Sequence, residues 1–413
     1  MINLRKNCTT FSAILLFLLT GLISFEQHPI RFTAEAGEDA CIDFDQTENT
    51  INVNCNASFL NVVQTINDTK VLDSLGNGEY LLNTTLEVAD DITFEMNSSV
   101  AAGGGDNLQY LKIAGENGII VYGKILIDGV KITSWNISSN TIIPQDMNGN
   151  IRRGYIQFAA SEGSQIINSE FGYLGDAEPG RRGFDLVGDG DGEPSHDMVI
   201  RASKFHDMWF AFYSNGAYNI VIDGNEYYNN IEYTVDPHSA THDMNITNNH
   251  VHHNRIGVIC SLDCYNILID GNKVYHNREY GIFFSRNMHD SIARNNHVYN
   301  SSTGIMISES PNNEIHNNTI ERATSHGIRL FNPILPDDGL TEGNLVYNNT
   351  IISSQNGIVA TRSHDNIVQN TKFSDIESSE YRLSGDSSII VEQQFHNASI
   401  SHDSSATTIR QRQ

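Results

Sequence analysis

Short apolar runs separated by turn residues repeat along most of the chain. Between residues 257 and 360 each run opens on glycine and reads Gly-Val-Ile-Cys, Gly-Ile-Phe-Phe, Gly-Ile-Met-Ile, Gly-Ile-Arg-Leu or Gly-Ile-Val-Ala. These glycines are separated by 24, 23, 23 and 30 residues, and the longest interval contains a proline-bounded insertion at 332–338. The glycine column is Gly257, Gly281, Gly304, Gly327 and Gly357. Runs this short, rich in β-branched and aromatic residues and bounded by Asn, Gly, Asp and His, predict β-strands.

A second column of the repeat consists of asparagines: Asn249, Asn272, Asn296, Asn318 and Asn349. Asparagine tolerates left-handed backbone, and its amide can hydrogen-bond its equivalent in the next repeat. Such short strands bury a face only when successive coils stack in register. We therefore predict an all-β fold, a single-stranded right-handed parallel β-helix (a solenoid) with coils of about 23 residues. The leucine spacing of leucine-rich repeats and the Trp-Asp signature of propellers are absent.

The regularity of the repeat divides the chain. The β-helix is predicted over 116–372, and 37–115 is predicted to form an N-terminal cap with irregular first coils. Residues 55–67 have helical spacing and are expected to cover the open N-terminal edge. The segment 373–413 is serine-rich and polar, which predicts a loose final coil or a tail.

The first 36 residues have the pattern of a targeting segment. Arg5 and Lys6 precede an apolar run at 11–25. This pattern is typical of a secretory signal peptide, and an uncleaved N-terminal anchor is the alternative. We expect a secreted, periplasmic or cell-surface protein that contacts a membrane only through this segment, and a monomer.

The net charge of the chain limits the kinds of molecule that it can bind. The chain has 25 Lys and Arg against 50 Asp and Glu, so its net charge of −25 argues against a nucleic-acid partner. An acidic substrate needs a local basic cluster.

In an exported chain, Cys41–Cys55 and Cys260–Cys264 are each spaced for a local disulfide, although Cys260 could equally be a small buried apolar residue.

One coil departs from the repeat. Counting back 24 residues from the first glycine of the column gives Tyr233, which aligns Asp236 with apolar strand positions of other coils. Pro237 follows it and removes a ladder donor. Both residues cost stability, and such exceptions concentrate where function requires them. His238 comes next, and Arg286 is expected two coils later, roughly 10 Å away along the axis.

Over roughly residues 115–350 the sequence resembles the mannuronan C5-epimerases, alginate-modifying parallel β-helix enzymes of the periplasmic kind. The likeness is strongest in Tyr-Thr-Val-Asp-Pro-His at 233–238 and in the segment 281–296. The resemblance implies that His238 is the proton acceptor, with Tyr233 and Asp236 beside it, and that an arginine neutralises the substrate carboxylate. Two features differ: Ser239 stands where the family has another Asp, and the pair Ser285-Arg286 comes one coil later than in the family.

The chemistry of C5 inversion assigns roles to these residues. The C5 proton of a uronic acid is feebly acidic, so its removal requires a positioned base and cations that stabilise the developing charge. His238, held by Asp236, is the expected base, and Arg286 is the expected carboxylate clamp. Tyr233 or a bound water would return the proton. Other basic residues are less well placed by sequence as substrate-binding candidates: Arg181, Arg182, Arg201, Lys204 and Arg255.

The sequence thus predicts an isomerase that acts on an acidic polysaccharide. Two alternatives stay open: a β-eliminating lyase or hydrolase of acidic polysaccharide, which would share the base, and a non-catalytic glycan-binding surface protein. No cofactor is predicted to be required. Ca²⁺ is an option because Asp189, Asp191 and Glu193 alternate around glycines, but no full Ca²⁺-loop pattern follows, which favours a solvated acidic loop.

Overall fold

The computed structural model describes residues 40–99, 107–188, 193–335, 338–392, 399–402 and 408–411. Residues 40–413 form one compact unit. The predicted signal peptide or anchor at 1–36 lies outside the described residues. Within the described ranges, no helix has the length and apolar character needed to cross a membrane.

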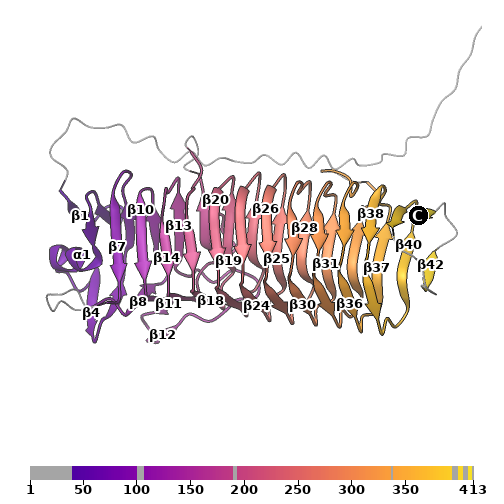
Figure 1. Cartoon of the computed structure of the whole chain (residues 1–413). Helices are drawn as coiled ribbons and strands as arrows, with labels where there is room; N and C mark the ends of the chain where they lie inside the picture. The colour runs from indigo at the N-terminus through magenta and orange to yellow at the C-terminus, as the bar shows by residue number, and fades with distance from the viewer. Residues whose placement is uncertain are drawn as a thin grey trace, which may run out of the picture. The chain divides into compact units, whose positions relative to one another are not determined.

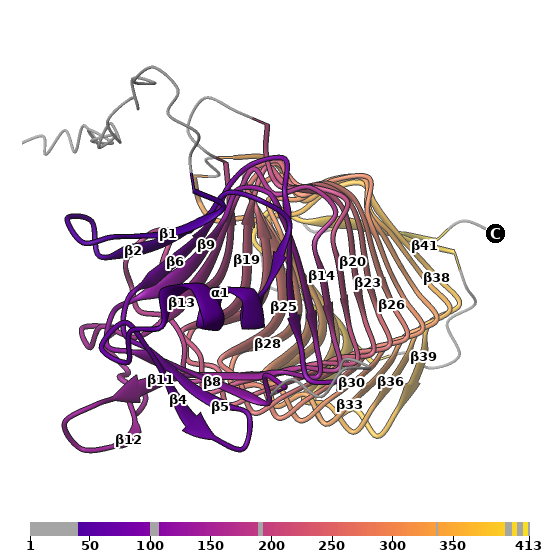
Figure 2. The same ribbon diagram turned by 90° about the vertical axis from the view of Figure 1, so that its left-hand side faces the viewer.

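The unit is a stack of coils, each of which contributes one strand to each of three sheets (Figures 1 and 2). Sheet A has 15 strands, in the order β1 (Ile42–Asp45), β2 (Thr50–Val53), β6 (Thr85–Val88), β9 (Gly118–Val121), β13 (Tyr155–Ala159), β16 (Gly183–Val187), β19 (Phe210–Asn215), β22 (Tyr233–His238), β25 (Ile256–Ser261), β28 (Tyr280–Ser285), β31 (Thr303–Ser308), β34 (His326–Phe331), β37 (Asn356–Thr361), β40 (Ser379–Ser384) and β42 (Ile400–His402).

Sheet B has 14 strands, in the order β3 (Ala57–Ser58), β7 (Thr93–Asn97), β10 (Lys124–Asp128), β14 (Gln165–Ile167), β17 (Val199–Arg201), β20 (Tyr218–Asp223), β23 (His242–Thr247), β26 (Tyr265–Asp270), β29 (Ile292–Arg294), β32 (Glu314–His316), β35 (Leu345–Tyr347), β38 (Asn366–Gln369), β41 (Ser388–Glu392) and β43 (Thr408–Gln411).

Sheet C also has 14 strands: β4 (Leu72–Gly76), β5 (Glu79–Leu82), β8 (Tyr110–Ala114), β11 (Lys131–Asn136), β15 (Glu170–Gly172), β18 (Lys204–His206), β21 (Glu226–Tyr228), β24 (His250–His252), β27 (Lys273–Tyr275), β30 (His297–Tyr299), β33 (Thr319–Glu321), β36 (Thr350–Ile352), β39 (Lys372–Ser374), and β12 (Thr141–Ile142), which pairs with β11. Among the described strands only the β1/β2, β4/β5 and β11/β12 pairs are antiparallel. The predicted parallel β-helix is therefore confirmed.

The core lies between the three sheets and is filled by one apolar residue set that runs through all coils. In β25, for example, Val258 and Cys260 point into this core. The glycine column is required by the close approach of the coils. A Cβ atom on Gly257 would lie 2.4 Å from the carbonyl oxygen of Gly281 and 2.8 Å from a methyl carbon of Val274. A side chain at this position therefore forces neighbouring coils apart.

The asparagine column forms a buried ladder, as predicted. The amide nitrogen of Asn272 donates to the side-chain oxygen of Asn296 at 3.0 Å, and Asn249 donates to Asn272 at 3.0 Å. The left-handed backbone expected at these asparagines is instead found one residue earlier, for example at Asn248 and Asn295. The ladder asparagines also pair with backbone groups of the preceding coil. Asn272 accepts from the backbone N–H of Asn249 at 2.9 Å and donates to the carbonyl of Ile246 at 2.8 Å.

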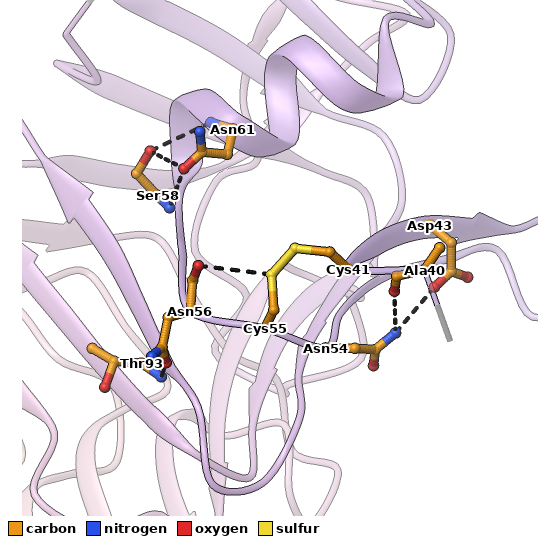
Figure 3. Close-up of a disulfide and its surroundings, with 9 residues drawn as sticks. All are labelled: Ala40, Cys41, Asp43, Asn54, Cys55, Asn56, Ser58, Asn61 and Thr93. Atoms are coloured by element: carbon orange, nitrogen blue, oxygen red, sulfur yellow. Dashed lines mark hydrogen bonds between the residues drawn. A yellow bond between two sulfur atoms is a disulfide. The ribbon is translucent and has the colours of Figure 1, made fainter. Parts of the chain in front are cut away.

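The N-terminal end is covered by the helix α1 (Phe59–Ile66), which lies within the predicted helical segment 55–67 (Figure 2). Ser58 caps the helix, and Phe59 and Val62 bury their side chains in the core. Just before α1, the expected disulfide between Cys41 and Cys55 is present (Figure 3). This covalent link ties β1 to the turn that enters the helix.

The second expected disulfide is not formed. Cys260 and Cys264 are free thiols, and both are buried in the core. The alternative interpretation of Cys260, a small buried apolar residue, is the one the structure supports. At the other end of the chain, regular pairing extends past residue 372, since β40 and β41 pair in parallel with β37 and β38.

Candidate functional site

The strand register around the unusual coil differs by one residue from the sequence alignment. Tyr233 pairs with Ile256 and His238 pairs with Ser261, so Thr234, and not Tyr233, stands opposite Gly257. Asp236 accordingly pairs with outward-facing Tyr213 on β19, and it is Pro237 that occupies an inward position. The expectation that Asp236 replaces a core residue is therefore wrong. It lies on the outer face of sheet A.

His238 stands at the end of β22 on this outer face and is partly buried. Its Nε2 lies 2.9 Å from Nη2 of Arg286, and its Nδ1 lies 2.6 Å from Oγ of Ser239. Since a guanidinium only donates, Nε2 accepts, and the neutral ring carries its proton on Nδ1. Burial lowers the pKa of His238 to about 4, and Arg286 and Arg182 lower it in the same sense. The imidazole is therefore a neutral acceptor at physiological pH.

Arg286 reaches His238 from two coils away. Its backbone follows Ser285, which pairs with Ser261, and Ser261 pairs with His238. The side chain extends back across this intervening coil, and Nε and Nη2 donate to Oγ of Ser261 at 3.1 and 2.7 Å. The 10 Å separation expected from the backbone therefore does not apply to the functional groups. The long side chain of Arg286 spans the intervening coil, so its guanidinium contacts the imidazole of His238.

Asp236 does not hold His238 by a hydrogen bond, contrary to the expectation from the sequence. Both of its carboxyl oxygens are buried, and neither has a hydrogen-bond partner in the part of the chain that the structure describes. Burial raises the pKa of Asp236 well above its usual value, while Arg182 and Arg286 oppose the shift. One coil before Tyr213, buried Asp185 has its pKa raised to about 6 by desolvation. Orientation of the imidazole falls to Ser239, which the sequence did not assign to the site.

Aromatic rings surround this group on the outer face of sheet A. Tyr213 lies 5.4 Å from the His238 ring, and the guanidinium carbon of Arg182 lies 4.1 Å from the centre of the Tyr213 ring. Tyr233 packs edge-on against Phe210 at 5.2 Å, and burial raises its pKa. Tyr213 was missed by sequence reasoning because it carries no motif. Only its pairing opposite Asp236 brings it to the site.

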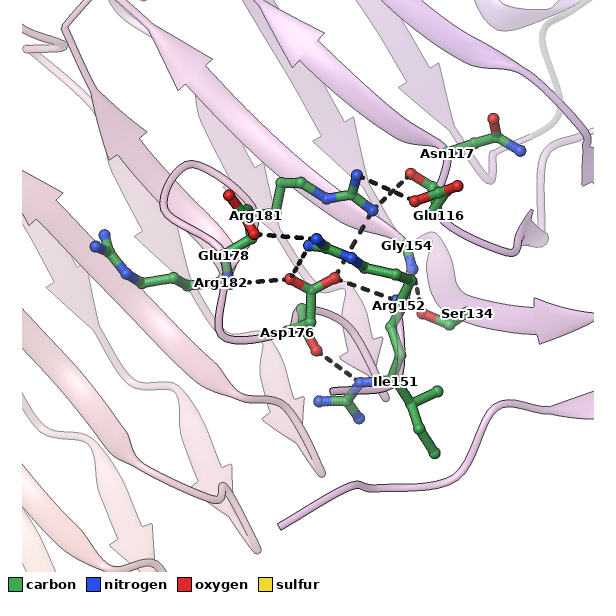
Figure 4. Close-up of polar contacts among 12 residues, drawn as sticks. Glu116, Asn117, Ser134, Ile151, Arg152, Gly154, Asp176, Glu178, Arg181 and Arg182 are labelled. Atoms are coloured by element: carbon green, nitrogen blue, oxygen red, sulfur yellow. Dashed lines mark hydrogen bonds and ion pairs between the residues drawn. The ribbon is translucent and has the colours of Figure 1, made fainter. Parts of the chain in front are cut away.

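The remaining basic candidates lie apart from His238 or are committed to ion pairs. Arg181 donates to the backbone carbonyl of Glu116 at 2.9 Å and lies 3.7 Å from the carboxylate of Asp176 (Figure 4). Arg255 is paired with Glu232 and, at 2.8 Å, with Glu279, although its guanidinium carbon also lies 5.9 Å from the Tyr233 ring.

Two candidates are on other sheets. Arg201 ends β17 in sheet B and pairs with Asp223 at 3.2 Å. Lys204 begins β18 in sheet C and lies 3.5 Å from Glu226. The structure thus brings together Tyr233, Asp236, His238, Arg286 and Arg182, and it separates Arg201 and Lys204 from them.

The acidic segment considered as an option for Ca²⁺ is mostly outside the described residues, which include Glu193 but not Asp189 or Asp191. Within the described ranges, one group of side chains has ligand atoms close enough to share a cation: Glu162, His196 and Asp197. Their ligand atoms lie within 4.8 Å of one another, and His196 Nδ1 already contacts Asp197 at 3.0 Å. This group is on the edge of sheet B and is separate from His238.

Comparison with known proteins supports the fold and the suspected relationship. Residues 235–395 match the family model described as the right handed beta helix region, in agreement with the predicted handedness. Among curated proteins, the chain is 26% identical over 192 residues to a mannuronan C5-epimerase of Pseudomonas syringae pv. tomato, covering 44% of this chain and 34% of that protein. It is 27% identical over 155 residues to that of Pseudomonas fluorescens, covering 35% and 28%. The chain thus spans about a third of the length of the curated relatives it matches.

Solved structures give the same fold. A variant of the periplasmic alginate epimerase AlgG superposes with a TM-score of 0.66 at 19% identity, covering 88% of this chain and 84% of that one. The A-module of mannuronan C-5 epimerase AlgE6 from Azotobacter vinelandii superposes with a TM-score of 0.57 at 15% identity, covering 81% and 89%. The resemblance indicated by the motif at 233–238 is confirmed.

Proposed function

We propose that this chain, which is similar to mannuronan C5-epimerases over 192 residues, inverts C5 of uronic acid residues in a polyuronate, with His238 as the base. The contact between Arg286 and Nε2 of His238 carries the proposal. It joins a neutral imidazole that has an acceptor nitrogen to a cation suited to a carboxylate, and these are the two groups that C5 deprotonation needs. The acidic polymer is the partner, and the chain acts outside the cytoplasm as a monomer without a required cofactor.

Substrate binding would activate the base. The sugar carboxylate competes for the guanidinium of Arg286, which frees the Nε2 lone pair of His238. Pairing of that cation with an anion also weakens the charge that lowers the pKa of His238, so its basicity rises as the substrate binds. The charge that develops on the carboxylate is stabilised by Arg286, with Arg182 nearby.

The other residues act on the charge balance and on the return of the proton. The raised pKa of Asp236 favours its protonated form, which adds no negative charge where the anion binds. The phenol of Tyr233, whose pKa is also raised, stays protonated and can donate to C5 from the opposite face, as can a bound water. Ser239 keeps the proton of His238 on Nδ1 and so keeps Nε2 free to accept.

The test is a proton NMR time course on polymannuronate in deuterated water. An epimerase introduces deuterium at C5 without changing the chain length, whereas a lyase produces unsaturated ends. His238→Gln should abolish the exchange. The matched control is His242→Gln, which removes a histidine of sheet B whose Nδ1 is hydrogen-bonded to the carboxylate of Asp243 at 2.7 Å. This variant should keep full activity. Full exchange by the His238→Gln protein, or no exchange by the wild type on any polyuronate, would refute the proposal.

A further inference from the structure

A second group of basic and aromatic residues lies on the same outer face of sheet A, at β34. Ile328 and Leu330 of this strand are in the core, so the alternating residues Arg329 and Phe331 point outward. Phe331 occupies the same column as His238, and four steps between neighbouring strands separate them. At ~4.8 Å per step, the two positions are about 19 Å apart along the solenoid.

Cations gather around Phe331. The guanidinium carbon of Arg329 lies 4.4 Å from the ring centre, and that of Arg362 lies 5.3 Å from it. Arg382 stands in the same column as Arg329, two strands further on, and is exposed. The charges of Arg329 and Arg382 both lower the pKa of His326.

The basic cluster has polar atoms with no partner. Nε of Arg329, Nδ1 of His326 and Oδ1 of Asn356 are all buried, and none has a hydrogen-bond partner among the described residues. Among the described residues, no carboxylate affects the pKa of Arg329, which is lowered by burial and by Arg362 and is raised by Tyr280. This is notable in a chain with 50 acidic residues and 25 Lys and Arg. Half-buried, mutually repelling cations destabilise a fold, so this arrangement indicates an anion that binds from solution.

Two columns of outward-facing residues on sheet A join the residues around His238 to those around Phe331. Between the two groups, the residues in these columns are uncharged. The column of His238 continues through Ser261, Ser285 and Ser308 to Phe331. The neighbouring column runs from Asp236 through Ile259, Phe283 and Met306 to Arg329. Hydroxyl groups beside apolar and aromatic side chains suit the edges and faces of sugar rings. Within these two columns, a polymer that lies along the surface therefore meets no carboxylate between β25 and β31.

We propose that Arg329, Arg362 and His326, with Phe331 as a platform, form a second anion site that binds a uronate carboxylate several sugars away from the residue over His238. The identity of the polymer rests on the function proposed above, whereas the anion site rests on the cluster itself. Two sites on one polymer reinforce each other, because binding at the first raises the local concentration of carboxylates at the second. Only chains long enough to reach both sites gain from this.

The experiment measures binding by calorimetry, with a mannuronate trisaccharide and with polymannuronate long enough to span both sites. Arg329→Gln should weaken binding of the long chain about tenfold, which corresponds to about 1.4 kcal/mol, and should leave the trisaccharide affinity unchanged. The matched control is Arg322→Gln, which removes the same charge from a residue paired with Glu321 at 2.8 Å, beside sheet C. This control should change neither affinity by more than about twofold.

Stability separates a binding site from a structural role. Because no described carboxylate forms an ion pair with Arg329, Arg329→Gln should leave the melting temperature unchanged or raise it. Arg362→Gln provides a second variant with the same expected binding loss. Unchanged long-chain affinity in both folded variants, or a wild type that binds no polyuronate, overturns the second site. Long-chain binding that depends on Arg329 but is accompanied by no C5 exchange supports this site and refutes the epimerase function. C5 exchange by the wild type, together with a long-chain affinity that Arg329→Gln and Arg362→Gln do not change, supports the epimerase function and refutes this second site.

Discussion

The proton affinity of His238 is the property on which the proposed chemistry depends most directly. The pKa of this residue lies at about 4, compared with 6.5 for an unperturbed histidine. At about 1.4 kcal/mol per pKa unit, this difference corresponds to about 3 kcal/mol against protonation. Burial is the largest cause, followed by Arg286 and Arg182. Replacing Arg286 with Gln removes one cation and the strongest donor to Nε2, so the pKa of His238 should rise by about one unit.

The assay is an NMR titration of the imidazole carbon-bound protons, with the His238 signal assigned by its loss in His238→Gln. Arg322→Gln serves as a control for net charge and should leave the titration of His238 unchanged. A wild-type pKa near 6.5 would refute the burial and charge argument. A pKa that stays near 4 in Arg286→Gln would show that Arg286 does not contribute to the lowering, and it would remove the mechanism by which the substrate activates its base.

Three further predictions concern stability. At pH values above 7, Asp236→Asn should raise the melting temperature, because ionising a buried carboxyl without hydrogen bonds costs free energy. A lower melting temperature at that pH would contradict this. Asn272→Ala should lower the free energy of unfolding in urea by about 2–4 kcal/mol, because buried backbone groups lose their partners. Gly281→Ala should cost a similar amount, since the new Cβ would lie 2.3 Å from a methyl carbon of Val298, whereas Gly188→Ala, with nothing within 4 Å, should be nearly neutral by the same measurement.

The pH dependence of stability also follows from the lowered pKa values of His238 and His326, both about 4. Below pH 6.5 the unfolded chain binds protons that these folded side chains do not, so stability should fall as the pH drops from 6.5 to 4. Asp185, whose folded pKa is raised to about 6, acts in the opposite direction, because its contribution is present at low pH and is lost as the pH rises through 6.

The motif at 233–238 identified the site without structural information, because an acid, a proline and a histidine in one strand of a repeat are an exception that the sequence itself displays. Ser239, Tyr213 and the cluster at Arg329 were not identified. Each is an ordinary residue in its own coil, and it becomes informative only when neighbouring strands bring its partners beside it. The prediction that Arg201 and Lys204 bind substrate is not supported for a related reason. They are near the motif in sequence, but the coil places them on sheets B and C, away from His238.

The sequence by itself determined the period, the parallel β-helix and the coil that carries the chemistry. The glycine column allows similar coils to stack closely, and the asparagine column joins successive turns by hydrogen bonds. The tertiary structure alone decided the strand register, which turned Asp236 outward, and the position of the Arg286 guanidinium beside His238. A repeat fixes backbone positions to within about one residue, but side-chain direction reverses with each residue of a strand and an arginine can span two coils. Contacts between coils are therefore settled by packing in three dimensions.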